Sequence, residues 1–274
     1  MTVEPVRVSP DWLALREEAD ATARAADLAE ELRRSLPDGE TLFVHDLGCG
    51  TGSMGRWLAP RLGRRQHWVL YDWDADLLPR ARGAMPRASA DGAAVTSETR
   101  RRDVSRLDLD DLAGASMITA SALLDLMTAD ELTRCVQTCV GAGCPVLITL
   151  SVTGRVELDP WDPLDEQVAD AFNAHQRRSA GDRTLLGPDA VEAAVEAFTR
   201  LGSDVLVRPS PWRLGAAEAA LAADWFSGWV GAACEQRPEL AVAVEPYARR
   251  RLCDAAAGRL GVTVDHVDLL AVPR

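Results

Sequence analysis

The chain has 274 residues, of which 47% are apolar and 26% are charged, and this composition is typical of a soluble globular protein with one large domain. Its 30 basic residues, all arginine, are outnumbered by 42 acidic residues, so the net charge is −12. This balance argues against a partner such as nucleic acid or an anionic membrane, because both require a broad basic face.

No apolar segment approaches the roughly 18 residues that a membrane-spanning helix needs. The first residues, MTVEPVRVSPDW, also lack the basic start and apolar core of a secretory signal. We therefore expect a cytoplasmic protein whose six cysteines stay reduced.

The first half of the chain alternates short apolar runs with helical stretches, a pattern that indicates an α/β fold with a mostly parallel sheet covered on both faces. A first helix is predicted over 11–35 as part of an N-terminal cap spanning residues 1–40. The sequence then predicts strands at 41–48, 67–72, near Asp103, 115–121 and 144–151, with helices at 56–62, 75–82 and from Thr128 to 140. Residues 41–151 form the core of the predicted domain.

The second half departs from this alternation at residue 152. Residues 152–187 are polar and acidic, so we predict an insertion over the carboxyl ends of the strands. A helix at 188–201 and a strand at 204–208 follow, and a second insertion at 209–261 contains helices at 215–236 and 244–260. A seventh strand, 262–272, alternates apolar and polar residues, which predicts a position near a sheet edge.

The turn after the first predicted strand is the most informative segment. In HDLGCGTGSMG, residues 45–55, a buried strand runs through Gly48, Gly50 and Gly52 directly into a helix. Glycines allow positive φ angles and let a ligand approach the backbone. Open α/β sheets bind ligands at this end of their strands, so the turn predicts a nucleotide-type site.

Two cofactor classes fit the glycine turn. Gly50, Gly52 and Gly55 match the dinucleotide spacing, and Asp72 follows at the expected distance, which leaves an NAD(P)-dependent oxidoreductase open. Asp46 favours the second class, a zwitterionic ligand that carries an ammonium group. A carboxylate so close to the turn would repel a pyrophosphate but would form a charge-assisted hydrogen bond with an ammonium group.

The ordered motifs resemble those of class I S-adenosylmethionine-dependent methyltransferases. They are DLGCGTG after the first strand, an acidic residue ending the second in YDWD, Asp103-Val104, and ASALLDL at the fourth strand. The resemblance covers residues 41–151 and implies a Rossmann-like sheet of seven strands with an antiparallel last strand. The two helices of the second insertion depart from the minimal family pattern, and we expect the two insertions to form a lid on the acceptor side.

The resemblance also implies the contacts of the cofactor. Asp46 and the backbone of Gly48, Gly50 and Gly52 would surround the methionine part. Asp72 would accept the ribose hydroxyls, and Ser121 would lie beside the methionine part. Trp73, Asp103 and Val104 would hold adenine. Arg16 could meet the ligand carboxylate if the first helix covers the site, although a solvated surface arginine is the commoner case at such a position.

Methyl transfer is an in-line displacement that depends on positioning, and an acceptor with an acidic proton would gain from a general base. His175 is one candidate, since it shares a helical stripe with Val168 and Phe172, although such a histidine can simply be buried in a core. Asp125, just past the fourth strand, is the other candidate. The stripe of Leu221, Trp225 and Trp229 predicts either packing or an aromatic wall of the acceptor pocket.

We predict no metal site. Cys135 and Cys139 are one helical turn apart and Cys144 follows, but no matching pair stands at zinc-like spacing. The acidic run within residues 156–166 could bind a divalent cation, yet acids before a helix also cap it.

The sequence thus predicts methyl transfer from S-adenosylmethionine to the oxygen, nitrogen or carbon of a small-molecule acceptor. The alternatives are the oxidoreductase and a non-catalytic ligand-binding protein on the same fold. The oligomeric state is not indicated.

Overall fold

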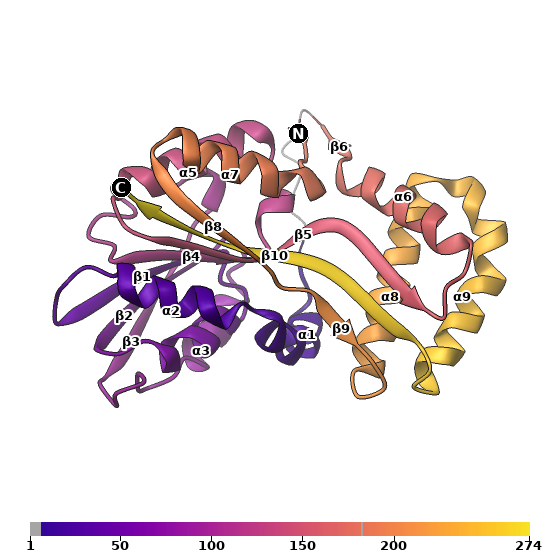
Figure 1. Cartoon of the computed structure of the whole chain (residues 1–274), viewed down its shortest axis with the longest axis horizontal. Helices are drawn as coiled ribbons and strands as arrows, with labels where there is room; N and C mark the ends of the chain where they lie inside the picture. Colours follow the sequence, from indigo (N-terminus) through magenta and orange to yellow (C-terminus); the bar gives the residue numbers. More distant parts are fainter. Residues whose placement is uncertain (1–6, 182) are drawn as a thin grey trace.

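The computed structural model of the chain describes residues 7–181 and 183–274, so residues 1–6 of the predicted N-terminal cap lie outside the described residues. Its central sheet has the strand order β3-β2-β1-β4-β5-β10-β8, and β9 pairs with β10 beside it (Figure 1). The strands of this sheet are β1 (Thr41–Leu47), β2 (Arg65–Asp72), β3 (Val95–Arg101), β4 (Met117–Ser121), β5 (Val146–Asp159), β8 (Ser203–Pro209), β9 (Trp212–Leu214) and β10 (Gly261–Pro273). A separate two-stranded hairpin consists of β6 (Ser179–Ala180) and β7 (Arg183–Thr184).

The expected parallel core and antiparallel last strand are confirmed. Strands β1 to β5 pair in parallel, whereas β10 runs antiparallel to both β5 and β8. The final strand lies between β5 and the edge strand β8, so its predicted position near a sheet edge is confirmed. Its alternation is one of burial, because Val264, His266 and Asp268 are buried whereas Asp265 and Val267 between them are only partly buried.

Helices cover both faces of the sheet. They are α1 (Pro10–Ala23), α2 (Ala26–Ser35), α3 (Ser53–Leu58), α4 (Leu78–Gly83), α5 (Ala129–Gly141), α6 (Leu164–Gln176), α7 (Ala190–Arg200), α8 (Ala219–Gln236) and α9 (Ala241–Ala256). Short 3-10 turns occur at Ala59–Arg61 (η1), Val104–Arg106 (η2), Leu124–Leu126 (η3), Gly187–Asp189 (η4) and Pro238–Leu240 (η5). One apolar core lies between the sheet and α2, α3 and α4, and a second lies under α5 and α7. Strand β1 serves both, with Val44 in the first core and Leu47 in the second, because alternate side chains point to opposite faces.

The predicted N-terminal helix is two helices. Arg24 leaves the helical backbone with φ −55° and ψ 134°, and the chain turns there from α1 into α2. Helix α2 packs on the sheet through Leu28 and Leu32, whereas α1 continues toward β9. The break therefore frees α1 to cover the carboxyl end of the sheet.

A long ribbon of β5 and β10 carries a second lobe. Strand β5 was expected to end at residue 151, but it continues to Asp159, paired with β10 up to Gly261. Helices α6, α8 and α9 pack around this extension on a third apolar core that includes Leu158, Phe226 and Val262. In Figure 1 the ribbon runs from the sheet into the lobe at the right, so the two predicted insertions meet there.

Strand β5 bends where it leaves the main sheet. Its register with β10 shifts twice, near Leu150, which has φ 56°, and near Gly154, which has φ 81°. The Leu150 N–H donates to Asp268 Oδ1 at 2.8 Å, and Asp268 Oδ2 accepts the Ala25 N–H at 2.8 Å. One buried carboxylate thus joins the bend of β5 to the junction of α1 and α2. Bulges of this kind redirect side chains beside functional sites.

No helix among the described residues is long and apolar enough to cross a membrane.

Candidate active site

A cavity of about 430 Å³ lies between the main sheet, α1 and the second lobe. It is within the size range of small-molecule sites. One end is lined by residues that follow β1, β2 and β4, and the other by residues of α1, the bent part of β5, α6, β9, α8 and β10. We call the first the strand end and the second the lobe end of the cavity.

The glycine turn lines the strand end. Gly48 and Gly50 have φ angles of 66° and 55°, and a Cβ on Gly48 would come within 3.1 Å of the Leu123 side chain. Asp72 supports the turn from the next strand, because its Oδ2 accepts the Gly50 N–H at 2.9 Å. Burial raises the pKa of Asp72. The carboxylate also lines the cavity, so it can hold the turn and face a ligand.

Asp46 carries a buried carboxylate with one oxygen that has no hydrogen-bond partner among the described residues. Oδ1 accepts the hydroxyl of Thr119 on the neighbouring strand at 2.8 Å, but Oδ2 has no hydrogen-bond partner among the described residues. Burial raises the pKa of Asp46 to about 7. A cationic group beside Oδ2 would restore its charged form.

The predicted adenine residues lie together at the strand end. Trp73, Asp103 and Val104 all line the cavity. Asp103 is exposed and caps η2, with Oδ1 accepting both the N–H and the hydroxyl of Ser105 at 3.1 and 2.7 Å. Trp73 lies 5.6 Å from the guanidinium of Arg7. The motif spacing thus brings these three side chains to one place, as it does Gly48 and Gly50. Gly52 is not among the residues that line the cavity, and a Cβ there would lie 3.2 Å from the backbone of Ala81.

Arg16 lines the cavity but is already paired. Its Nε donates to both oxygens of Asp20 at 3.0 and 3.1 Å, and its guanidinium lies 4.8 Å from the centre of the Trp212 ring. Asp20 also accepts the indole N–H of Trp212 at 3.0 Å. The structure therefore ties Arg16 to the lobe end rather than leaving its guanidinium open to an anion.

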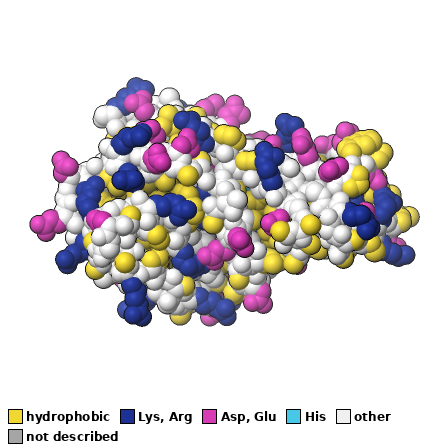
Figure 2. Space-filling view, turned by 60° about the horizontal axis from the view of Figure 1, so that its bottom comes forward, with side chains coloured by type: hydrophobic (Ala, Val, Ile, Leu, Met, Phe, Trp, Pro, Cys, Tyr) yellow, Lys and Arg dark blue, Asp and Glu magenta, His cyan; other side chains and the backbone are white. Residues whose placement is uncertain are grey.

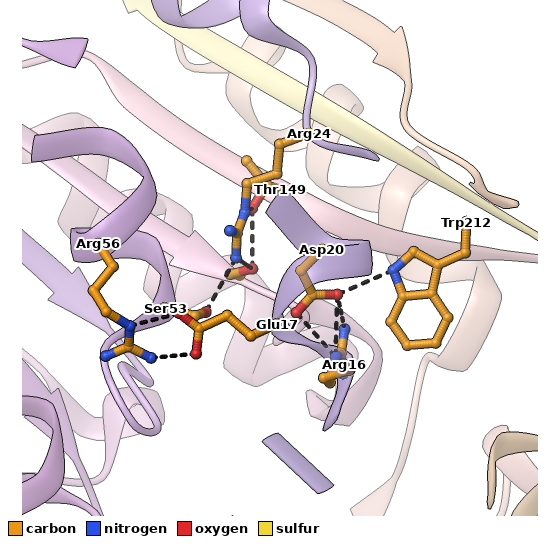
Figure 3. A network of polar contacts seen from close by, with 9 residues as sticks. Arg16, Glu17, Asp20, Arg24, Ser53, Arg56, Thr149 and Trp212 are labelled. Carbon is orange, nitrogen blue, oxygen red and sulfur yellow. Dashed lines mark hydrogen bonds and ion pairs between the residues drawn. The ribbon is translucent and has the colours of Figure 1, made fainter. Parts of the chain in front are cut away.

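Arg24, which the sequence did not single out, lies beneath the strand end (Figure 3). Its Nη2 donates to Ser53 Oγ at 3.1 Å and to Ser121 Oγ at 3.2 Å, and its Nε donates to Thr149 Oγ1 at 3.4 Å. Ser121, predicted beside the methionine part, does line the cavity, as does Ser53. The sequence gives no sign that Arg24 is buried beside the site, because its burial depends on the break between α1 and α2.

The two predicted general bases are separated by the fold. Asp125 in η3 lines the cavity, and burial raises its pKa, although Arg16 and Arg178 oppose the shift. His175 is not among the cavity residues, and its Nδ1 lies 3.9 Å from Glu235 of α8. Helix α6 turns Phe172 and Gln176 toward the cavity instead. This placement argues against His175 as the general base.

The lobe end has aromatic walls. They include Trp12 of α1, Phe172 of α6, Trp212 of β9 and Trp225 of α8. Of the predicted stripe on α8, Trp225 reaches the cavity, while Trp229 stacks behind it at 5.3 Å between ring centres. Leu221 is buried in the core of the second lobe. The stripe thus serves packing in two residues and the cavity wall in one.

His266 of β10 also lines the lobe end. It lies 5.3 Å from the Trp212 ring, and burial lowers its pKa to about 3, with Arg16 adding to the shift. The side chain is therefore a neutral imidazole at physiological pH. Sequence reasoning missed it because the twist of the ribbon, rather than any local motif, turns this face of β10 toward the cavity.

In the described part of the chain, no three histidine, cysteine, aspartate or glutamate side chains are grouped to hold a metal ion.

A family model described as a methyltransferase domain matches residues 44–142, which span β1 to the end of α5. These residues therefore form a methyltransferase domain. The match covers the segments that line the strand end of the cavity, and it favours the methyltransferase over the oxidoreductase among the two classes that the glycine turn allows.

The chain is similar to several solved structures. A methyltransferase from Geobacter sulfurreducens, in complex with S-adenosylhomocysteine, is 16% identical, with a TM-score of 0.44 and coverage of 97% of this chain and 99% of that one. One from Thiobacillus denitrificans, with the same ligand, is 13% identical, with a TM-score of 0.46 and coverage of 98% and 100%. The YcgJ protein of Bacillus subtilis is 11% identical, with a TM-score of 0.48 and coverage of 91% and 99%. No curated protein matches the sequence of the chain.

The groups at the strand end would fit S-adenosylmethionine as a cofactor. Oδ2 of Asp46 is buried without a hydrogen-bond partner among the described residues and would suit an ammonium group, and the Asp72 carboxylate lies beside the turn where ribose hydroxyls would need acceptors. A side chain on Gly50 would intrude toward Leu13, since a Cβ there would lie 3.3 Å from Leu13 Cδ1.

Proposed function

We propose that the protein is an S-adenosylmethionine-dependent methyltransferase and that it methylates a small molecule that binds at the lobe end of its cavity. The observation that carries the proposal is the composition of that end. Four aromatic side chains surround a space continuous with the strand end, and they come from elements that are far apart in the sequence. Aromatic walls with a few polar groups favour a compact ligand with a flat apolar part.

The charge of the chain supports the same proposal. On the face drawn in Figure 2, arginine and acidic side chains are interspersed, and no continuous basic surface covers it. A protein that binds a nucleic acid needs such a surface. The six cysteines are free, as expected of a protein in the reducing cytoplasm, and we include that location in the proposal.

We assign the cofactor contacts to the residues at the strand end. Asp46 would hold the ammonium group, Asp72 the ribose hydroxyls, and Trp73 and Val104 the adenine ring. Asp103 would accept from the adenine amino group with Oδ2, which lies 3.3 Å from Nε of the exposed Arg106 and keeps a second lone pair to accept with. The backbone at Gly48 and Gly50 would allow close approach of the methionine part, with Ser121 beside it. Gly52 would serve the turn itself, since a Cβ there would press against Ala81 of α4.

The bound cofactor supplies an electrophilic methyl group. The chain must then position the acceptor atom in line with that group and exclude water, which are the main sources of rate in such a displacement. We assign the proton transfer to Asp125, the cavity carboxylate outside the cofactor contacts whose raised pKa suits a base. The ionised side chain would accept the proton that leaves an oxygen or nitrogen acceptor.

The experiment has two stages. Calorimetry with S-adenosylhomocysteine and with NADH should give binding of the first ligand only. Transfer of a radioactive methyl group is then measured with matched panels of phenols, aromatic amines, aliphatic amines and carboxylic acids, and with RNA and protein extracts. Label in a ring-containing small molecule supports the proposal, whereas label only in the macromolecules contradicts it.

A non-catalytic role predicts a different result. In that case S-adenosylhomocysteine binds, but no panel member is labelled and none changes the affinity for the cofactor. If NADH binds and S-adenosylhomocysteine does not, the result would instead support the oxidoreductase alternative.

A further inference from the structure

The guanidinium of Arg24 is a buried cation without an ion pair among the described residues. The residue is 3% exposed, and Nη1 has no hydrogen-bond partner within the described ranges. Burying an unpaired charge is costly, so a buried arginine is expected to have an anion nearby.

The carboxylates around Arg24 are engaged elsewhere. Asp20 pairs with Arg16, and both oxygens of Asp268 accept backbone N–H groups. Asp46 is also near enough to interact with Arg24 electrostatically, but it lies beyond ion-pair distance. These acids reduce the cost of the buried charge without binding it directly.

Two serine hydroxyls connect Arg24 to the cavity. Ser53, at the start of α3, and Ser121, at the end of β4, both accept from the same nitrogen, Nη2, and both line the cavity. Ser121 Oγ also accepts the hydroxyl of Thr149 at 3.0 Å. Because these oxygens act as acceptors toward Arg24, each serine keeps its own O–H proton to donate.

Such an arrangement matches a carboxylate. The hydroxyls of Ser53 and Ser121 lie close together because both are bound to Nη2 of Arg24. The positive charge of Arg24 polarises both O–H groups, and polarised donors bind an anion more tightly. Asp46 lies on the strand next to β4, with its register partner Thr119 two residues before Ser121. An acceptor for an ammonium group and donors for a carboxylate therefore stand side by side, as one α-amino acid requires.

We propose that Ser53 and Ser121 bind the carboxylate of the methionine part of the cofactor, and that Arg24 is the positioning residue that orients and polarises them. The inference rests on the proposed function. It replaces Arg16, the sequence candidate for this contact, because the Arg16 guanidinium is bound to Asp20 and stacked on Trp212.

The test measures binding and needs no acceptor. Calorimetry compares S-adenosylhomocysteine with S-adenosyl-3-thiopropylamine, which keeps the adenosine, sulfur and amine but lacks the carboxylate. The variants are Ser53→Ala, Ser121→Ala and Arg24→Met, and Arg16→Met is the matched control. The two serine variants remove one oxygen each and keep the test decisive if Arg24→Met fails to fold.

We expect the wild-type protein to bind the decarboxylated analogue at least tenfold more weakly than S-adenosylhomocysteine. Each serine variant should weaken S-adenosylhomocysteine binding about tenfold, as expected for a hydrogen bond to a charged group. The same variants should change binding of the analogue less than twofold. Arg16→Met should affect both ligands equally.

Three results overturn the inference alone. They are equal wild-type affinity for the two ligands, serine variants that weaken both ligands equally, and a carboxylate-specific loss in Arg16→Met. A wild-type protein that binds neither ligand overturns the proposed function, and the inference with it.

Discussion

Asp72 accepts the backbone N–H of Gly50 through Oδ2 and that of Asp74 through Oδ1, each at 2.9 Å. One carboxylate at the end of β2 therefore fixes the glycine turn after β1 and the turn after its own strand. The side chain is 6% exposed, and that exposed part faces the cavity. Its roles in holding the turn and in binding ribose are thus physically linked.

Replacing Asp72 with alanine should weaken binding of S-adenosylhomocysteine by about 1.5–3 kcal/mol, because charge-assisted bonds to the ligand are lost and the turn is released. Isothermal calorimetry measures the change. Asp76→Ala is the control, because Asp76 lies in the same turn but its side chain is 81% exposed. An Asp72→Ala protein with wild-type affinity would remove Asp72 from the cofactor site.

The raised pKa of Asp46 predicts pH-dependent cofactor binding. Burial raises the pKa to about 7, Arg24 opposes the shift and Asp72 adds to it. The ammonium group of the ligand requires the ionised carboxylate, so below about pH 7 a proton must first leave. The affinity should therefore fall by up to about tenfold for each pH unit below 7.

Calorimetry of S-adenosylhomocysteine binding between pH 5 and 8 tests this dependence, and a release of protons near neutrality should accompany binding. In Asp46→Asn the affinity should be lower and this slope should be lost. A variant that keeps the wild-type slope would assign the titration to another group, such as Asp72.

The strand end of the cavity could be predicted because its signals are local. A glycine turn after a buried strand, and acidic residues at the ends of the following strands, occur within short segments whose partners are fixed by a parallel sheet. Asp46, Asp72 and Trp73 therefore line one cavity, as expected. The alternation of elements likewise predicts the sheet and the helices on both of its faces.

The lobe end could not be predicted because it depends on contacts between distant segments. The bends near Leu150 and Gly154 continue β5 into the second lobe and bring β10 and its His266 to the cavity. The helical stripe of His175 is real, but periodicity alone does not say which partner the stripe faces. In the fold it faces α8, and the imidazole lies near Glu235.

Asp125 should control the rate of methyl transfer without affecting cofactor binding. Asp125→Asn should lower kcat by about 10²–10⁴-fold for an acceptor that loses a proton, while the affinity for S-adenosylhomocysteine stays unchanged. Because burial raises the pKa of Asp125, the wild-type rate should rise with pH above the ordinary range of a carboxyl group. Steady-state kinetics over pH, with an acceptor found in the panels, measures both effects.

His175→Gln provides the comparison for Asp125→Asn. It should leave kcat and its pH profile near those of the wild-type protein, since His175 lies outside the cavity residues. A large loss of kcat in His175→Gln, with Asp125→Asn active, would reverse the assignment of the base.

The second lobe should depend on a buried ion pair for its stability. Asp165 at the start of α6 contacts Arg251 of α9 at 2.8 Å, with side chains 8% and 2% exposed, and also accepts the Tyr247 hydroxyl at 2.6 Å. Asp165→Asn leaves the Arg251 charge buried without its partner, so we expect a loss of about 3–5 kcal/mol in the free energy of unfolding. By contrast, Arg177 and Asp189 form an ion pair with side chains 42% and 56% exposed, and Asp189→Asn should cost about 0–1 kcal/mol. Urea denaturation of the two variants measures both values, and equal losses would show that burial does not determine the strength of the Asp165–Arg251 pair.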